Sequence, residues 1–368
     1  MTGALARSKL PDQCRLSDLP RADPQHDLED TPPRERSYSP CTDRQGSPSL
    51  PRAIIRVLTP TPKMATSYCM MTLSQLLGRF PDEESCKRYL FERRWPDGVA
   101  KCPRCGNDKV HKIGQPWKWQ CKKCAKNGYR FSIITGTIFQ DTKYPLRTWF
   151  QVAFLMLTAK KGISAMQIQR ALGSPLTGGV GSYQTFWYLA QRLRAAMQNE
   201  EFNKLMGVVE VDETFIGGKA KNRHVSKRGR GTGWSGKTSV IGAISRKGNV
   251  VAKVIENTDT ETLEGFVREA VSDKVDLVAT DDAGGYRNLK AKGYPHETVN
   301  HSAGEYVRGE VHTANIDSFW SLLKRGIVGQ FHHVSKKYLP LYMNEFTFRH
   351  DARRQDVGVA FDRMMAYA

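Results

Sequence analysis

The stretch GVVEVDETFIGG, residues 207 to 218, marks the point where the sequence changes to β-rich runs. Its valine, isoleucine, phenylalanine and threonine residues favour a strand, and glycines flank it. Two similar runs follow, KTSVIGAIS at 237–245 and NVVAKVIEN at 249–257. The SRKG turn between them predicts that these two runs form a hairpin.

The elements that follow the hairpin complete a recognisable order. We expect a helix entered through an approximate capping box at Thr260, a short buried strand at 275–281, a helix at 283–293, and a final long helix that opens with Asp317. Three strands, a helix, a strand and two further helices are the order of a ribonuclease-H-like α/β fold. We therefore predict a catalytic domain of this type at 205–355.

Three acids occupy special places in that order. Asp212 lies on the first strand, Asp281 at the carboxyl end of the fourth, and Asp317 in the first turn of the last helix. Clustered carboxylates repel one another unless cations neutralise them, and hard oxygen donors select Mg²⁺ or Mn²⁺. Two such ions activate a water or a 3'-hydroxyl and stabilise the leaving oxygen of a phosphodiester. The alternative is that these are ordinary strand-end and helix-cap aspartates.

The segment HTANIDSFWSLLKRG, residues 312 to 326, suggests how the third acid is used. Asp317, Trp320 and Lys324 fall on one helical face, because seven residues make two turns. We expect Asp317 to bind metal, Lys324 to reach a phosphate near the scissile bond, and Trp320 to anchor the helix to the sheet. A surface helix that buries only Trp320 is the alternative.

Four cysteines predict a structural zinc ion. They form two CxxC pairs with 15 residues between them: Cys102, Cys105, Cys121 and Cys124. Two such knuckles complete a closed tetrahedral Zn²⁺ site, which leaves no open position for catalysis. A redox CxxC or a chance occurrence is the alternative, although a redox site needs one pair rather than two.

Composition indicates a polyanionic partner. The chain of 368 residues carries 56 Lys+Arg against 37 Asp+Glu, a formal charge of +19, which favours nucleic acid or an anionic membrane. Because no apolar run is long enough to span a bilayer and no signal segment is recognisable, we expect a cytoplasmic, nucleoid-associated protein without a membrane partner. Residues 1–63 are rich in Pro, Ser, Asp and Arg, and are interpreted as a disordered leader or a mis-annotated start.

Two N-terminal modules are expected between the leader and the catalytic domain. Residues 71–140 should hold short helices and the zinc ribbon, whose lysines and arginines alternate with aromatic residues, as in nucleic-acid-binding surfaces. Residues 141–200 resemble a helix-turn-helix whose second helix would carry Arg192 and Arg194 to DNA. Solvated charge on the ribbon and a helical hairpin that only packs are the alternatives.

A basic loop separates the first two β-rich runs. Residues 217–237 hold seven basic residues, no acids and several glycines. We expect the loop to follow a DNA backbone through Lys227, Arg228 and Arg230, with Arg325 as a further DNA contact. A merely solvated loop is the alternative.

The chain from about 71 onward resembles the bacterial insertion-sequence transposases of the DDE superfamily that carry an N-terminal zinc ribbon, the ISXO-type group. The matching pieces are FPDEESC, CPRCG with WQCKKC, VEVDETFIGGK, TDDAGGY, HTANIDSFWSLLKRG and NEFTFRH. The resemblance implies DNA cleavage followed by strand transfer. It also implies a catalytic triad of Asp212, Asp281 and the acid of the motif at 312–326.

The third position of the triad departs from the pattern of this group, in which it is commonly Glu. Here the candidates are Asp317 and Asn315. Asp317 is preferred because its charge suits a divalent ion and because of its spacing to Lys324, while Asn315 would orient the site. The expected partners are the element ends and the target DNA, bound by a homodimer or higher oligomer. A nuclease of the same fold without joining activity, and a DNA-binding protein with a decayed core, are the alternative functions.

Overall fold

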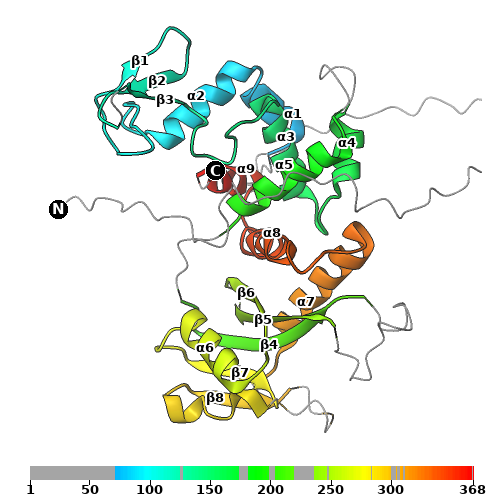
Figure 1. Ribbon diagram of the computed structural model, residues 1–368. Helices are drawn as coiled ribbons and strands as arrows, with labels where there is room; N and C mark the ends of the chain where they lie inside the picture. Colours follow the sequence, from blue (N-terminus) through cyan, green and yellow to red (C-terminus); the bar gives the residue numbers. More distant parts are fainter. Residues whose placement is uncertain are drawn as a thin grey trace, which may run out of the picture. The chain divides into compact units, whose positions relative to one another are not determined.

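The computed structural model describes residues 71–124, 127–173, 181–198, 204–218, 236–246, 248–282, 284–299, 304, 307–309, 311–366 and 368. Met70–Ala368 form one compact unit, which holds a five-stranded sheet, a three-stranded sheet and helices (Figure 1). The leader predicted at 1–63 lies outside the described residues, as does most of the basic loop, including Lys227, Arg228 and Arg230.

The larger sheet has the strand order β6-β5-β4-β7-β8. Its strands are β4 Val208–Ile216, β5 Thr238–Ser245, β6 Val250–Ile255, β7 Leu277–Asp281 and β8 His296–Val299. β5 is antiparallel to both β4 and β6, whereas β7 is parallel to both β4 and β8. The first four strands and the β5–β6 hairpin confirm the sequence predictions, and β8 was not predicted.

Helices cover both faces of this sheet (Figure 1). α6 Thr260–Ala270 packs on one face, where it shares a core with the β4 residues Val209 and Val211. α7 Ala314–Gly326 packs on the opposite face, and α8 Leu339–Asp351 shares its core. Because side chains alternate along a strand, the even-numbered β4 residues Glu210 and Asp212 face α7.

Three local expectations were wrong. The cap of α6 is Asp259, whose carboxylate accepts the Thr262 N–H at 2.8 Å, and not Thr260. Where a helix was predicted at 283–293, the described residues 284–293 form two short 3-10 turns, η6 Gly284–Tyr286 and η7 Lys290–Lys292, because consecutive glycines disfavour a helix. Nor is α7 the last element: it is followed by the π-helical turn η9 Ile327–Phe331, by α8 and by α9 Val357–Ala366.

A second core is built mainly from helices that precede the larger sheet in sequence. They are α1 Leu73–Arg79, α2 Glu83–Arg94, α3 Leu146–Thr158, α4 Ala165–Leu172 and α5 Tyr183–Ala196. α1, α2 and α4 each begin with a capping box, as at Ser164 and Gln167 of α4. α9 joins this core from the other end of the described chain, where Asp362 accepts a hydrogen bond of 2.7 Å from the Tyr89 hydroxyl.

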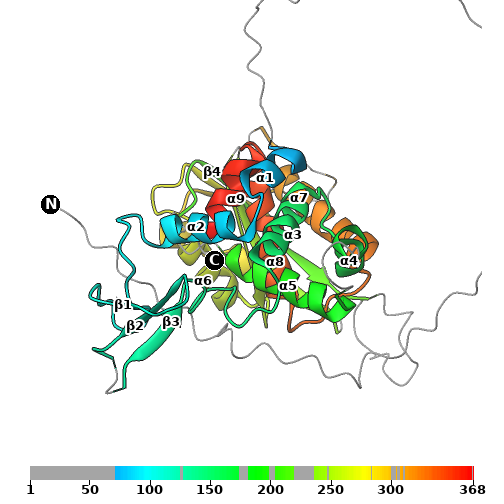
Figure 2. The ribbon, with the colours of Figure 1, turned by 90° about the horizontal axis from the view of Figure 1, so that it is seen from above.

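The small sheet consists of β1 His111–Lys112, β2 Lys118–Cys121 and β3 Tyr129–Ser132, all antiparallel. It lies to one side of the helices, beside α2 (Figure 2). Phe91 of α2 stacks on Trp119 of β2 at 6.0 Å between ring centroids, and Trp119 stacks in turn on Phe131 of β3 at 5.8 Å. None of the described helices is long and apolar enough to cross a membrane.

Candidate functional site

Two of the three predicted acids meet where β7 ends beside the middle of the central strand β4. β4 and β7 run parallel with Glu210 opposite Ala279, so the same register places Asp212 beside Asp281. Carboxylate oxygens of Asp212, Glu213 and Asp281 all lie within 4.8 Å of one another. Sequence reasoning missed Glu213, although its position next to Asp212 in the VDET motif was a signal that could have found it.

The electrostatics of this cluster favour a cation. Desolvation by burial, followed by repulsion from Asp281, Glu213 and Asp317, raises the pKa of Asp212 to about 7. Burial likewise raises the pKa of Glu213 to about 7, although the Tyr286 hydroxyl donates a hydrogen bond to it. Three hard oxygen donors that repel one another in the absence of a cation suit a divalent ion such as Mg²⁺ or Mn²⁺.

The acids line an open cleft. Its volume is about 440 Å³, and Lys324 of α7 lies on its wall together with Asp212, Glu213 and Asp281. The cleft therefore combines carboxylates that suit a metal ion with an ammonium group that suits a phosphate. Lys324 thus lies in the same cleft as the acids, and its contact with a phosphate near the scissile bond stays a prediction.

Asp317 approaches the cluster from α7 but is not part of the closest group. It is exposed in the first turn of the helix, and its charge contributes to the raised pKa of Asp212. The Thr313 hydroxyl donates a hydrogen bond to Asp317 Oδ2 at 3.2 Å. The structure thus places Asp317 near Asp212, and its assignment as a metal ligand stays a prediction.

Trp320 fixes α7 on the sheet, as predicted. Its indole Nε1 donates a hydrogen bond of 3.0 Å to Asp212 Oδ2. The ring packs over Gly242 of β5, which stands opposite Asp212, and a Cβ at that glycine would lie 2.6 Å from the ring. A glycine at this position is therefore what allows the helix to approach the strand.

The amide of Asn315, the alternative third ligand, is occupied elsewhere. Its Nδ2 donates a hydrogen bond of 2.8 Å to Glu210 Oε1, and its backbone N–H donates to Glu210 Oε2 at 2.8 Å. Asn315 therefore ties the start of α7 to β4. Whether it or Asp317 completes the acidic site stays a prediction.

The four predicted zinc ligands come together in the small-sheet module. Their sulfur atoms lie within 4.8 Å of one another, with Cys102 to Cys124 at 3.5 Å and Cys105 to Cys121 at 3.7 Å. A tetrahedral Zn²⁺ with bonds of about 2.3 Å needs sulfurs roughly 3.8 Å apart. The thiols therefore fit a closed structural zinc site.

The predicted DNA contacts of α5 are wrong. Arg192 and Arg194 are buried, with 4% and 2% of their surface exposed. Arg192 donates to the Gln140 carbonyl at 2.9 Å, and Arg194 Nε pairs with Glu345 of α8 at 2.6 Å. These guanidinium groups hold helices together and are not available to DNA. Arg325 is exposed, so its DNA contact stays a prediction.

Comparison with known families agrees with this geometry. The model of the ISXO2-like transposase domain matches residues 204–351, which span the larger sheet, α6, α7 and α8. This part of the chain is therefore similar to a known transposase domain. Residues 81–127 match the transposase zinc-ribbon domain, the region that contains the four clustered cysteines. The resemblance inferred from the sequence motifs is thereby confirmed.

The chain is also similar to a protein of Halobacterium salinarum. That relative is described as an uncharacterized protein in transposable element ISH50. The two sequences are 28% identical over 292 residues, which cover 75% of this chain and 93% of the relative. The similarity thus extends well beyond the catalytic motifs.

Proposed function

We propose that this protein is a transposase, which cuts DNA at the ends of an insertion sequence and joins those ends to target DNA. Asp212, Asp281 and Asp317 would hold Mg²⁺ or Mn²⁺, with Glu213 as an additional carboxylate. The observation that carries the proposal is the convergence of carboxylates from β4 and β7 in a cleft that also exposes the Lys324 ammonium.

The sheet supports a ribonuclease-H-like core. Three antiparallel strands, β4 to β6, are followed by β7 and β8, which add in parallel on the other side of β4. α6 is the crossover between β6 and β7, as expected for strands that end up parallel in one sheet. The acids occupy the central strand and its parallel neighbour, which are the positions predicted for this fold.

The residues around the cleft have separable roles in the proposed reaction. The divalent ions would activate the attacking water or 3'-hydroxyl and stabilise the leaving oxygen. Asp212 and Asp281 would hold them from the sheet, and Asp317 from α7. Lys324 would bind a phosphate of the bound strand, which keeps the scissile bond over the acids. Trp320 would keep α7, and with it Lys324, at a fixed distance from β4.

The zinc ribbon supplies a basic surface that suits the same substrate. Lys118 and Arg130 are exposed and lie on one side of the small sheet, where they line a shallow hollow. The rings of Trp119 and Phe131 are buried against the core and so are not available to stack on bases. We therefore propose phosphate contacts here, together with Lys227, Arg228 and Arg230, which lie outside the described residues.

Charge-neutral variants test the reaction. Asp212→Asn, Asp281→Asn and Asp317→Asn should retain DNA binding but lose Mg²⁺-dependent cleavage of a duplex that carries the element end. Asp282→Asn is the matched control, because Asp282 is an exposed acid next to Asp281 but is not part of the cluster. If Asp212→Asn cleaved like Asp282→Asn, the proposed site would be wrong.

The products and a second pair of variants refine the result. Cut ends joined to target DNA support a transposase reaction, whereas cut ends without joined product would indicate a nuclease of the same architecture. Asp317→Glu should retain measurable activity, since it keeps the charge. If Asp317→Asn were active and Asn315→Ala were not, the third ligand would be Asn315.

A further inference from the structure

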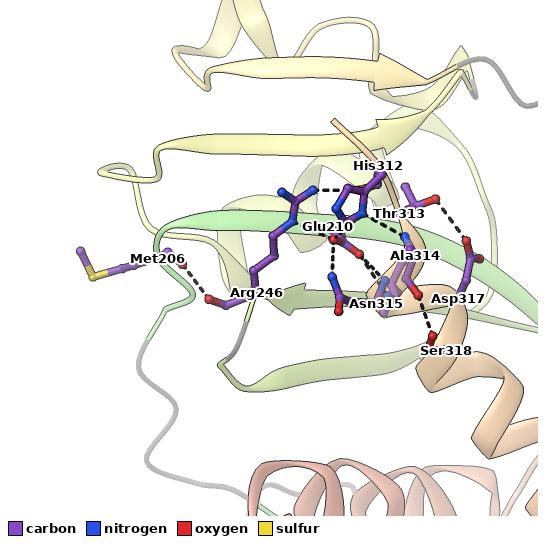
Figure 3. A network of polar contacts seen from close by, with 11 residues as sticks. Met206, Glu210, Arg246, His312, Thr313, Ala314, Asn315, Asp317 and Ser318 are labelled. Atoms are coloured by element: carbon purple, nitrogen blue, oxygen red, sulfur yellow. Dashed lines mark hydrogen bonds and ion pairs between the residues drawn. The ribbon is translucent and has the colours of Figure 1, made fainter. Parts of the chain in front are cut away.

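Helix α7 begins without a side-chain cap of its own. Thr313 occupies the N-cap position, but its hydroxyl makes no capping hydrogen bond and instead donates to Asp317. The free N–H groups of a first helical turn need acceptors. Here the Glu210 carboxylate supplies them: Oε2 accepts the N–H of Asn315 at 2.8 Å and that of Ile316 at 3.1 Å (Figure 3). The cap of α7 thus comes from a strand about a hundred residues earlier.

Glu210 is well suited to this task. It is fully buried on β4, with 0% of its surface exposed, and Arg246 Nε and His312 Nδ1 lie 3.0 Å and 3.2 Å from its Oε1 (Figure 3). Burying a carboxylate is costly unless it is paired and fully hydrogen-bonded. The positive end of the α7 dipole and the Arg246 guanidinium offset that cost. Glu210 is buried and does not line the cleft, so its carboxylate is not available for a direct contact with DNA.

Two contacts define where α7 lies on β4. Glu210 holds the helix at Asn315 and Ile316, and Asp212 holds it through Trp320 Nε1. Residues 210 and 212 are roughly 7 Å apart along a strand, and residues 315 and 320 are about 7.5 Å apart along a helix. The two contacts are therefore separated along both elements, and together they restrain α7 on β4. Asp317 lies between the two contact points.

We propose that Glu210 is a positioning residue for the third acid of the site. By acting as the cap of α7, it leaves the Thr313 hydroxyl to orient the Asp317 carboxylate near Asp212. The inference rests on the proposed function, in which Asp317 completes the metal site. It assigns the first acid of the VEVDET motif a role distinct from that of the second.

The first experiment compares two buried carboxylates in the full-length, zinc-loaded protein. Glu210→Gln keeps the shape but places an amide NH₂ against N–H donors. Glu345→Gln is the matched control, since Glu345 is also 0% exposed and pairs with Arg194 and Arg349, and none of these three residues lines the cleft. Mn²⁺ binding is measured by titration calorimetry, and cleavage of the element end is measured at saturating Mn²⁺.

The expected result distinguishes an effect on the position of α7 from a general loss of protein stability. Glu210→Gln should weaken Mn²⁺ binding and slow cleavage by about 10- to 100-fold, the usual effect of losing a residue that orients metal ligands. Glu345→Gln should stay within about twofold of the parent chain in Mn²⁺ affinity and in cleavage rate. This should hold even if its unfolding midpoint falls as far as that of Glu210→Gln, because a general loss of stability does not alter the folded site. Equal effects of the two variants, or a Glu210→Gln protein that matches the parent chain, would overturn the proposal.

A second pair of variants tests the Thr313 hydroxyl, which is buried and contacts Asp317. Thr313→Val removes the hydroxyl at almost constant volume, and Thr313→Ser retains it. We expect Thr313→Val to lose about tenfold in Mn²⁺ affinity, and Thr313→Ser to recover most of it. If Val and Ser behaved alike, the hydroxyl would have no orienting role.

Failure of this inference differs from failure of the proposed function. If the proposed function is wrong, Asp212→Asn and Asp281→Asn will cleave DNA like the parent chain. The role of Glu210 is then judged only from the Mn²⁺ affinity of Glu210→Gln. If only the inference is wrong, those two variants are inactive while Glu210→Gln binds Mn²⁺ and cleaves normally.

Discussion

Removing the charge of Asp212 is expected to stabilise the metal-free protein. Burial and neighbouring acids raise the pKa of this carboxyl from 3.8 to about 7, a difference of about three units. Each unit corresponds to about 1.36 kcal/mol, so ionised Asp212 costs the fold about 4 kcal/mol above pH 7. Asp212→Asn removes the charge, and its Oδ1 still accepts the Trp320 N–H. We expect the free energy of unfolding to rise by about 2 to 4 kcal/mol at pH 8.

The sign of the pH dependence follows from proton binding. Because the pKa is higher in the folded state, the folded protein binds more protons than the unfolded chain between about pH 4 and pH 7. The stability of the parent chain therefore falls as the pH rises through this window. The advantage of Asp212→Asn should be full at pH 8 and nearly absent at pH 4.

Urea denaturation provides the measurement. It is followed by tryptophan fluorescence, without added Mg²⁺ or Mn²⁺ but with the structural zinc retained. Asp282→Asn serves as the control and should change the free energy of unfolding by less than about 0.5 kcal/mol. Mg²⁺ at 100 times its dissociation constant should stabilise the parent chain by about 2.7 kcal/mol and leave Asp212→Asn unchanged. A metal-free Asp212→Asn protein that is less stable than the parent chain at pH 8 would refute this account of the cluster.

Three further predictions concern the other features of the site. Cys121→Ser should release the zinc and weaken DNA binding while the catalytic domain stays folded; one equivalent of zinc retained on metal analysis would contradict this. Gly242→Ala should cost about 1 to 3 kcal/mol in urea denaturation, because its Cβ would lie 2.6 Å from the Trp320 ring. Lowering the pH from 7 to 6 should reduce Mn²⁺ affinity by up to about tenfold for each carboxyl proton that metal binding displaces. The reason is that Asp212 and Glu213 both have a pKa of about 7. Calorimetry that shows equal affinity at the two pH values would argue against these raised pKa values.

The sequence predicted the parts of the fold that depend on local patterns. Runs of β-branched and aromatic residues identified β4 to β6, a short buried run identified β7, and the CxxC pairs identified the zinc ligands. Each of these signals lies in residues that are close together in the sequence. β8 was missed because HETV, residues 296–299, is short and polar and becomes a strand only by pairing with β7. Tertiary pairing decided its conformation.

The errors at the site have the same origin. Arg192 and Arg194 were assigned to DNA because their helix resembled the second helix of a helix-turn-helix. Their burial depends on Glu345 and on the Gln140 carbonyl, partners that no local pattern on α5 reveals. Similarly, no local pattern distinguishes Glu210 from other polar residues in strands, because its role depends on the start of α7, which contacts it only in the folded structure. Asp212 and Asp281 were predictable because, in this element order, the fourth strand lies next to the first. The end of β7 is therefore beside Asp212 of β4.

The return of α9 to the N-terminal helices has a consequence for the order of synthesis. The Tyr89 hydroxyl of α2 donates a hydrogen bond to Asp362 of α9, 273 residues later, and Phe361 packs against the rings of both Phe80 and Phe150. At 5 to 20 residues per second, the ribosome needs roughly 15 to 55 s to bridge that interval. The helices that support the zinc ribbon therefore cannot pack against α9 until the larger sheet has been synthesised. A nonsense mutation that removes α9 would damage the module encoded first and leave the strands that carry Asp212 and Asp281 intact.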